Sequence, residues 1–152
     1  MKETDRIIKL FEDLYKGTPW IDVNIVGTLN NITAAQSAKK IASNRNSIWE
    51  IVNHIISWRL AVLQRIQEKQ IVVPENNYFE PVKDPSESAW KNTLQQLEFS
   101  QQQWVAFLKT FKEADFEKLY QKRNMNYYEH IHGIIQHNAY HLGQITLLSK
   151  LI

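Results

Sequence analysis

The stretch that decides the fold is WKNTLQQLEFSQQQWVAFLKTF, residues 90–111. Large side chains recur in it at alternating steps of four and three residues. The positions in this series are Trp90, Leu94, Leu97, Gln101, Trp104, Leu108 and Phe111. Such spacing is typical of a helix that packs against neighbouring helices along one seam. Gln101, the polar member of the series, either sets the register of the helices or faces a site between them.

Two further long helices begin with the same start signal. Ser47 and Glu50 have the spacing of a capping box, and an apolar helical pattern follows them to about Lys69. Asn126 and Glu129 repeat this spacing ahead of a pattern that continues to the C-terminus. The sequence therefore predicts a second long helix ahead of the seam helix and a fourth long helix behind it.

The remaining helices have weaker start signals. A first helix is expected over about residues 2–16, with Thr4 as its cap. The seam helix is expected to begin at Asp84 as the cap, with Pro85 in the first helical position. A short helix is expected near Thr33, which has a capping-box partner three residues further on.

These elements point to one all-α domain over residues 1–152. Its length suits a single domain, and the sequence has no strand-like alternation, internal repeat or low-complexity segment. We predict an antiparallel four-helix bundle with a long connection between its second and third helices. Residues 71–85, which hold three of the four prolines, form this connection and are expected to be a crossover or a lid.

Composition excludes several classes of site and partner. The chain has no cysteine, so it has no disulfide scaffold, thiolate nucleophile or cysteine-ligated zinc site. Its net charge of +2, without a dense basic block, argues against nucleic acid as the main partner. No signal peptide and no apolar run of membrane-spanning length is present, so we expect neither secretion nor a membrane partner, and a cytoplasmic location.

Three histidines stand out as candidate metal ligands. His137 and His141 are four residues apart, so both side chains leave one face of the fourth helix at the edge of its apolar stripe. His54 has the same edge position on the second helix. Three protein ligands leave open positions on a divalent ion, as in catalytic zinc sites. The same spacing also occurs in histidines that simply pack at the edge of a core, without a metal.

Two other histidines are expected to stand apart from this site. His130 lies two helical turns before His137, too far to share an ion with His141, and is expected at the rim. His132 points elsewhere and is expected at the surface. Asn138 stands where the HExxH motif of metalloproteases has glutamate, so the pair is not of that class.

Two longer motifs resemble those of one known family. They are NSIWEIVNHIISWR, residues 46–59, and HGIIQHNAYHLGQI, residues 132–145. Together with GTPW at 17–20 and SESAW at 86–90, they make nearly the whole chain similar to the DinB-like (damage-inducible) superfamily. That resemblance implies a four-helix bundle in which three histidines hold a divalent metal. One lies in a W-x-x-x-x-H pattern, here Trp49 to His54, and two in H-x-x-x-H-x-G-Q, here His137 and His141.

The resemblance also implies a range of activities. Characterised members are mostly thiol-dependent: transferases that use bacillithiol or mycothiol, and a maleylpyruvate isomerase. Some members have been described as metal-dependent hydrolases, many form homodimers, and many have no known substrate. We therefore expect a divalent metal, zinc or nickel, that activates a low-molecular-weight thiol or a water against a small electrophilic substrate. Because the chain lacks cysteine, the thiol would come from a cofactor.

Supporting residues and alternative functions complete the prediction. Gln144 is expected to orient a histidine ring from behind, and Trp20, Tyr78 and Phe79 are candidates for the pocket wall. One alternative is a bundle protein that binds metal or responds to stress without catalysis. Another is a plain helical domain without metal, in which the histidines lie at the edge of the core.

Overall fold

The computed structural model describes residues 1–120 and 124–152, and these form helices and loops. The helices are α1 (Glu3–Lys16), α2 (Ile25–Leu29), α3 (Ala34–Ala38), α4 (Ile48–Ile66), α5 (Glu87–Thr110), the 3-10 turn η1 (Glu113–Asp115) and α6 (Tyr127–Ser149). The only β-type pairing among the described residues is an isolated bridge between Leu119 and Asn126. The all-α prediction is confirmed.

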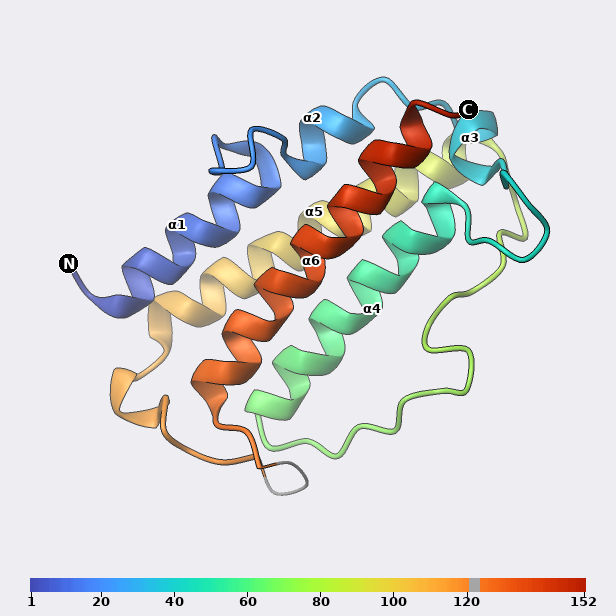
Figure 1. Ribbon diagram of the computed structural model, residues 1–152. Coiled ribbons are helices and arrows are strands. Elements are labelled where there is room, and N and C mark those ends of the chain that lie inside the picture. Colours follow the sequence, from blue (N-terminus) through green and yellow to red (C-terminus); the bar gives the residue numbers. More distant parts are fainter. Residues whose placement is uncertain (121–123) are drawn as a thin grey trace.

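Four long helices lie along one another (Figure 1). Helix α4 contacts α5 and α6, and α1 contacts the same two helices from the other side. Helices α4 and α6 run in opposite directions. His54 and Trp58 of α4 contact His137, which lies near the middle of α6. Just past the end of α4, Glu68 accepts from the hydroxyl of Tyr127, the first residue of α6. The antiparallel α4–α6 pair carries all three candidate ligands.

Helices α4 and α5 run in the same direction, which differs from a fully antiparallel bundle. Trp49 donates from its indole to Thr93 near the start of both helices. Further along, Arg59 donates to Ser100, and Trp104 donates to the carbonyl of Arg59. Two neighbouring parallel helices need a connection that returns along the bundle, and residues 67–86 provide it, passing beside α4 (Figure 1).

Tryptophan side chains fill the core at two levels. Trp104 is fully buried, and its ring stacks on Phe11 of α1 with centroids 5.1 Å apart. Trp49 and Trp90 meet at the other end of the bundle, with centroids 5.0 Å apart. The seam predicted for α5 therefore packs against α1 at one level and α4 at the other.

The start of α4 is fixed by a buried carboxylate. Glu50 accepts from the Ser47 backbone N–H at 2.7 Å, which completes the predicted capping box. Its other oxygen lies 2.8 Å from the Lys40 ammonium. Because Glu50 is buried and held on both oxygens, the first turn of α4 is anchored one turn before His54. The boxes predicted for α3 and α6 are present as well.

Three predicted boundaries were wrong. Thr4 lies inside α1, where its N–H donates to Glu113, and Lys2 is the N-cap. Ser86 caps α5 in place of Asp84, so Pro85 precedes the helix. Helix α4 ends at Ile66, three residues before the expected Lys69. Helix α2 was not predicted, because five residues give no readable period.

None of the helices in the described residues has the length and apolar character that a membrane crossing requires.

Candidate metal centre

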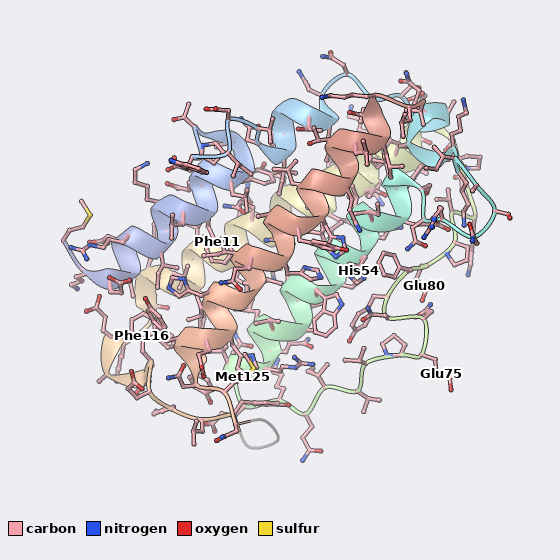
Figure 2. The ribbon with its side chains drawn as sticks, in the orientation of Figure 1. Phe11, His54, Glu75, Glu80, Phe116 and Met125 are labelled. Carbon is pink, nitrogen blue, oxygen red and sulfur yellow. The ribbon has the colours of Figure 1, made fainter. Side chains whose placement is uncertain are left out.

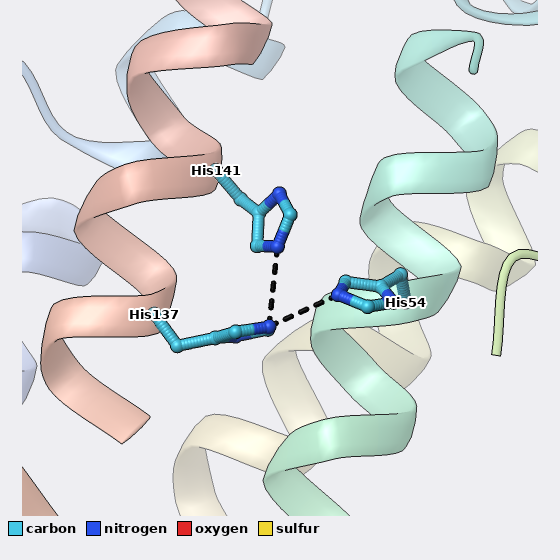
Figure 3. A group of neighbouring side chains, drawn as sticks. All are labelled: His54, His137 and His141. Carbon is cyan, nitrogen blue, oxygen red and sulfur yellow. Dashed lines mark hydrogen bonds between the residues drawn. The ribbon is translucent and has the colours of Figure 1, made fainter. Parts of the chain in front are cut away.

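Three imidazoles from α4 and α6 converge between the two helices (Figure 3). The Nε2 atom of His137 lies 3.0 Å from Nε2 of His54 and 3.1 Å from Nε2 of His141. One ligand atom of each ring lies within 4.8 Å of the others, so the group could hold a metal ion. His54 and His141 are buried, while His137 is half-buried. The structure therefore brings together the three histidines that the sequence singled out.

The outer nitrogens of two rings are held by oxygen acceptors. His54 Nδ1 lies 2.6 Å from the backbone carbonyl of Asn77, and His141 Nδ1 lies 2.7 Å from Oε1 of Gln144. An acceptor at Nδ1 places the ring proton there and leaves Nε2 with a free lone pair. The Gln144 amide is itself fixed, because its Nε2 donates to the Tyr140 hydroxyl at 3.1 Å. Such outer contacts orient the histidine ligands of metal sites.

The inner nitrogens need a positively charged or hydrogen-bonding partner. The Nε2 lone pairs of His54 and His141 both point toward Nε2 of His137, which carries at most one proton when the ring is neutral. That single proton can bond only one of the two lone pairs. The second lone pair then faces His137 Nε2 without receiving a hydrogen bond. A cation in the middle would satisfy all three nitrogens together.

The two separations that involve His137 also suit a first-row divalent ion. Two nitrogens bound to a tetrahedral zinc at about 2.0–2.1 Å lie roughly 3.3 Å apart. The observed separations of 3.0 and 3.1 Å are within a few tenths of that value. No described group hydrogen-bonds the buried Nδ1 of His137. His137 is thus the least constrained of the three rings.

Burial keeps all three rings neutral at physiological pH. It lowers the pKa of His54 to about 4, partly offset by the bond to Asn77, and the pKa of His137 to about 3, where His141 and His54 add to the effect. Burial also lowers the pKa of His141, against the opposing effect of Gln144. Neutral imidazole is the form that binds metal, so these rings are available as ligands without losing a proton.

Aromatic side chains from the α4–α5 connection cover the cluster. The Phe79 ring stacks on the His54 ring, with centroids 3.9 Å apart and planes 8° apart. Tyr78 meets Trp58 edge to face at 5.6 Å, and Trp58 donates from its indole to the Asn77 side chain at 3.1 Å. Figure 2 shows Glu75, earlier in the same connection, pointing away from the helices. The segment 77–79, here called the cover, closes one side of the candidate site.

The cover has an unusual backbone. Asn77 and Tyr78 have φ values of 51° and 63°, in the left-handed region that favours glycine. Each such residue costs about 1–3 kcal/mol and persists only where its surroundings fix it. Here the bonds from Asn77 to His54 and to Trp58 supply that fixation. The backbone strain and the orientation of the His54 ring are therefore coupled at Asn77.

Several predicted residues have other positions. Trp20 is 95% exposed and lines no wall of the site, so that prediction was wrong. His130 is buried with its ring 5.7 Å from that of Tyr120, and the rim position was wrong. His132 is half-buried against Tyr128, where a surface group was expected. Gln101 is buried inside the bundle, and no described residue hydrogen-bonds its amide.

The sequence did not indicate Asn77, Trp58 or Tyr140 as parts of the site. Asn77 contributes a backbone carbonyl, which no side-chain pattern can reveal. Trp58 and Tyr140 could have been found by helical spacing, because Trp58 follows His54 by four residues and Tyr140 precedes Gln144 by four.

Comparison with known proteins gives one match. A family model described as DinB superfamily matches residues 23–145, a range that contains all three histidines and helices α2 to α5 entire. No curated protein and no solved structure matched the chain.

Proposed function

The chain belongs to the DinB superfamily, and from this membership and the three converging imidazoles we propose that it is a divalent-metal-dependent enzyme. We propose His54, His137 and His141 as the ligands of one ion, zinc or nickel. The reaction class is transfer of a low-molecular-weight thiol, or of water, to a small electrophilic molecule. We also infer that the four long helices form the bundle of that family, with the long α4–α5 connection contributing to the site.

The observation that carries the proposal is the convergence of three Nε2 atoms, with His137 at 3.0 and 3.1 Å from its two partners. A divalent ion at such a centre lowers the pKa of a thiol or water bound to it, which makes that group nucleophilic near neutral pH. The chain's own contribution is orientation: Asn77 and Gln144 fix two rings with their lone pairs facing inward. Three ligands leave room for a nucleophile and a substrate.

The surroundings favour chemistry that is protected from bulk water. Phe79 covers one face of the His54 ring, and Trp58 lies 5.9 Å from the His137 ring. Apolar walls lower the local dielectric constant, which strengthens the interaction of the imidazole lone pairs with an ion. No cysteine is present in the chain, so a thiol nucleophile must be supplied as a second small molecule.

Metal content tests the ligand assignment. Protein made without a histidine tag is incubated with zinc or nickel, desalted and assayed by mass spectrometry for metal per chain. We expect one equivalent in the unaltered protein and none in the variant His54→Ala/His137→Ala/His141→Ala. His132→Ala is the matched control, because it removes a histidine of α6 outside the cluster, and it should retain the metal. An equal metal content in the triple variant and the control would refute the assignment.

Turnover tests the enzymatic part. The metal-loaded protein is presented with a panel of small electrophiles, each with and without a low-molecular-weight thiol. Product formation should disappear in the triple variant and after chelation, and should return when the metal is restored. Turnover that survives chelation and the triple variant would show that the three histidines are not its source.

A second candidate function is metal binding without catalysis. The stacking of Phe79 on His54 favours it, because the cover closes one side of the site. In that case metal would raise the melting temperature of the protein, while the electrophile panel would yield no product with any thiol. The two assays together separate the candidates.

A further inference from the structure

An open hollow of about 240 Å³ lies next to the candidate metal centre, on the outer side of two residues that contact its histidines. It shares two residues with the candidate metal centre. Phe79, which stacks on His54, forms part of its wall, and so does Gln144, which bonds His141. A larger hollow of about 300 Å³ between α1 and α5 shares no residue with the histidine cluster. Of these two hollows, the smaller one is placed next to the candidate centre.

The lining of this hollow is divided by chemistry. The segment that joins α3 to α4 contributes three polar side chains, Asn44, Arg45 and Asn46, together with the apolar Ile41. The rest is mostly apolar, with Ile51 of α4, Phe79 of the cover and Leu148 of α6. Its volume equals that of about eight water molecules at roughly 30 Å³ each. These dimensions suit a small molecule with one polar end and an apolar body.

The polar part of the lining carries one positive charge, that of Arg45. Arg45 is the charged residue of the lining, and no carboxylate among residues 1–120 and 124–152 forms an ion pair with it. Two acidic residues that adjoin lining residues in the sequence have other partners. Glu50 is held by Lys40 and Ser47, and Glu80, next to Phe79, accepts from the Asn76 side chain at 2.7 Å. A planar guanidinium matches a carboxylate in both charge and shape.

We propose that this hollow is the substrate site and that its ligand is a small organic carboxylate. The carboxylate bonds Arg45, and the apolar body lies against Ile51, Phe79 and Leu148. The role as substrate site rests on the proposed function, since it takes the neighbouring histidines as the reactive centre. The binding preference itself depends on the hollow and on Arg45 alone.

Chemical-shift titrations of the ¹⁵N-labelled full chain test this preference with phenylacetate, phenylacetamide and acetate. Phenylacetate should bind about fivefold more tightly than its neutral amide, the ratio expected for one exposed charge pair. Acetate, which lacks the apolar body, should bind more weakly than phenylacetate. The amide signals that shift should include residues 44–46 and the last turn of α6.

Three variants make the test specific. Arg45→Gln should lose the preference for the carboxylate, and Arg45→Lys should keep part of it. Lys39→Gln removes an exposed charge that does not line the hollow, and it should keep all of the preference. Arg45 is exposed and its side chain has no ion-pair partner among the described residues, so these variants are expected to fold, as circular dichroism will verify.

Each titration is run after chelation and again after zinc loading. The proposal is supported if the chelated and the zinc-loaded protein prefer phenylacetate over phenylacetamide by the same ratio, and if Arg45→Gln abolishes this preference. Equal binding of acid and amide, or a preference that survives Arg45→Gln, overturns it. A preference seen only with zinc means that the carboxylate binds the metal, which overturns this inference and leaves the proposed function standing. Failure of the histidines to bind metal would defeat the proposed function while the ratio measured after chelation stays valid.

Discussion

The depressed pKa values of two histidines predict how the stability of the metal-free protein depends on pH. Burial lowers the pKa of His54 from 6.5 to about 4 and that of His137 from 6.5 to about 3. Between these values and 6.5, the unfolded chain binds protons that the folded chain does not, so the free energy of unfolding falls as pH falls. The contribution of the two neutral rings to the free energy of unfolding is therefore complete above pH 6.5 and is lost as the pH falls below 6.5.

The size of this loss follows from the two shifts. At pH 5, an unfolded imidazole with a pKa of 6.5 is almost wholly protonated, while the folded rings remain largely neutral. Each ring then costs about 2 kcal/mol of stability relative to pH 7. His137 is only half-buried, and solvent weakens the effect of burial on such a ring, so we discount the sum by half. The expected net loss from the pair is about 2 kcal/mol.

Urea unfolding followed by tryptophan fluorescence measures this loss, since five tryptophans report on the fold. The chelated protein is compared with the double variant His54→Gln/His137→Gln at pH 7 and pH 5. The variant should lose about 2 kcal/mol less than the unaltered chain over this range, because its two amides do not titrate. His132→Gln leaves the cluster intact, so this variant should show most of the decrease in the free energy of unfolding between pH 7 and pH 5. Equal losses in the unaltered chain and the double variant would refute the reasoning.

Three further predictions concern the support of the site and the core. Gln144→Leu removes the acceptor at His141 Nδ1 and should weaken metal affinity by about 10- to 100-fold, measured by competition with a chromophoric chelator. Phe79→Ala removes the ring stacked on His54 and should speed metal release to a chelator, measured by stopped flow, without changing the metal-to-protein ratio. Trp104→Ala empties a fully buried position and should lower the free energy of unfolding by about 3–5 kcal/mol, while the folded fraction binds the same amount of metal.

Local signals predicted the helices well where the interactions themselves are local. The boxes at Ser47 and Asn126 involve residues three apart, so their spacing was sufficient. Thr4 failed as a cap because it bonds Glu113, 109 residues further along the chain. Asp84 failed because its carboxylate accepts from the Ser86 N–H, which leaves the Ser86 side chain to cap the helix.

The parallel course of α4 and α5 could not be read from the sequence. Both helices have an apolar face, and a connection as long as residues 67–86 permits either direction. The decision depends on contacts between distant segments. Trp90 donates to the carbonyl of Ile32, and Glu87 accepts from the Ala34 N–H, so α5 begins beside α3. Helix α4 also begins there, through the pair of Lys40 and Glu50.

In the candidate site too, residue spacing predicted the contacts within one helix but not the contacts between distant segments. The spacing of His137 and His141 placed both rings on one face of a helix. Only the packing of α4 against α6 brings His54 to within 3.0 Å of His137. The carbonyl of Asn77 depends on the path of the connection, and it carries no signature in the sequence.

The arrangement of the three rings is difficult to explain as core packing alone. A core histidine is normally satisfied by hydrogen bonds at both nitrogens, and burial without them is unfavourable. Here His54 and His141 donate their Nδ1 protons to Asn77 and Gln144. Their Nε2 lone pairs both face His137 Nε2, which can donate a proton to only one of these two lone pairs. The cover adds two residues in left-handed backbone conformations above the same cluster. An unsatisfied buried lone pair and a strained backbone that occur at the same place are typical of functional sites. A cation between the rings would satisfy that lone pair.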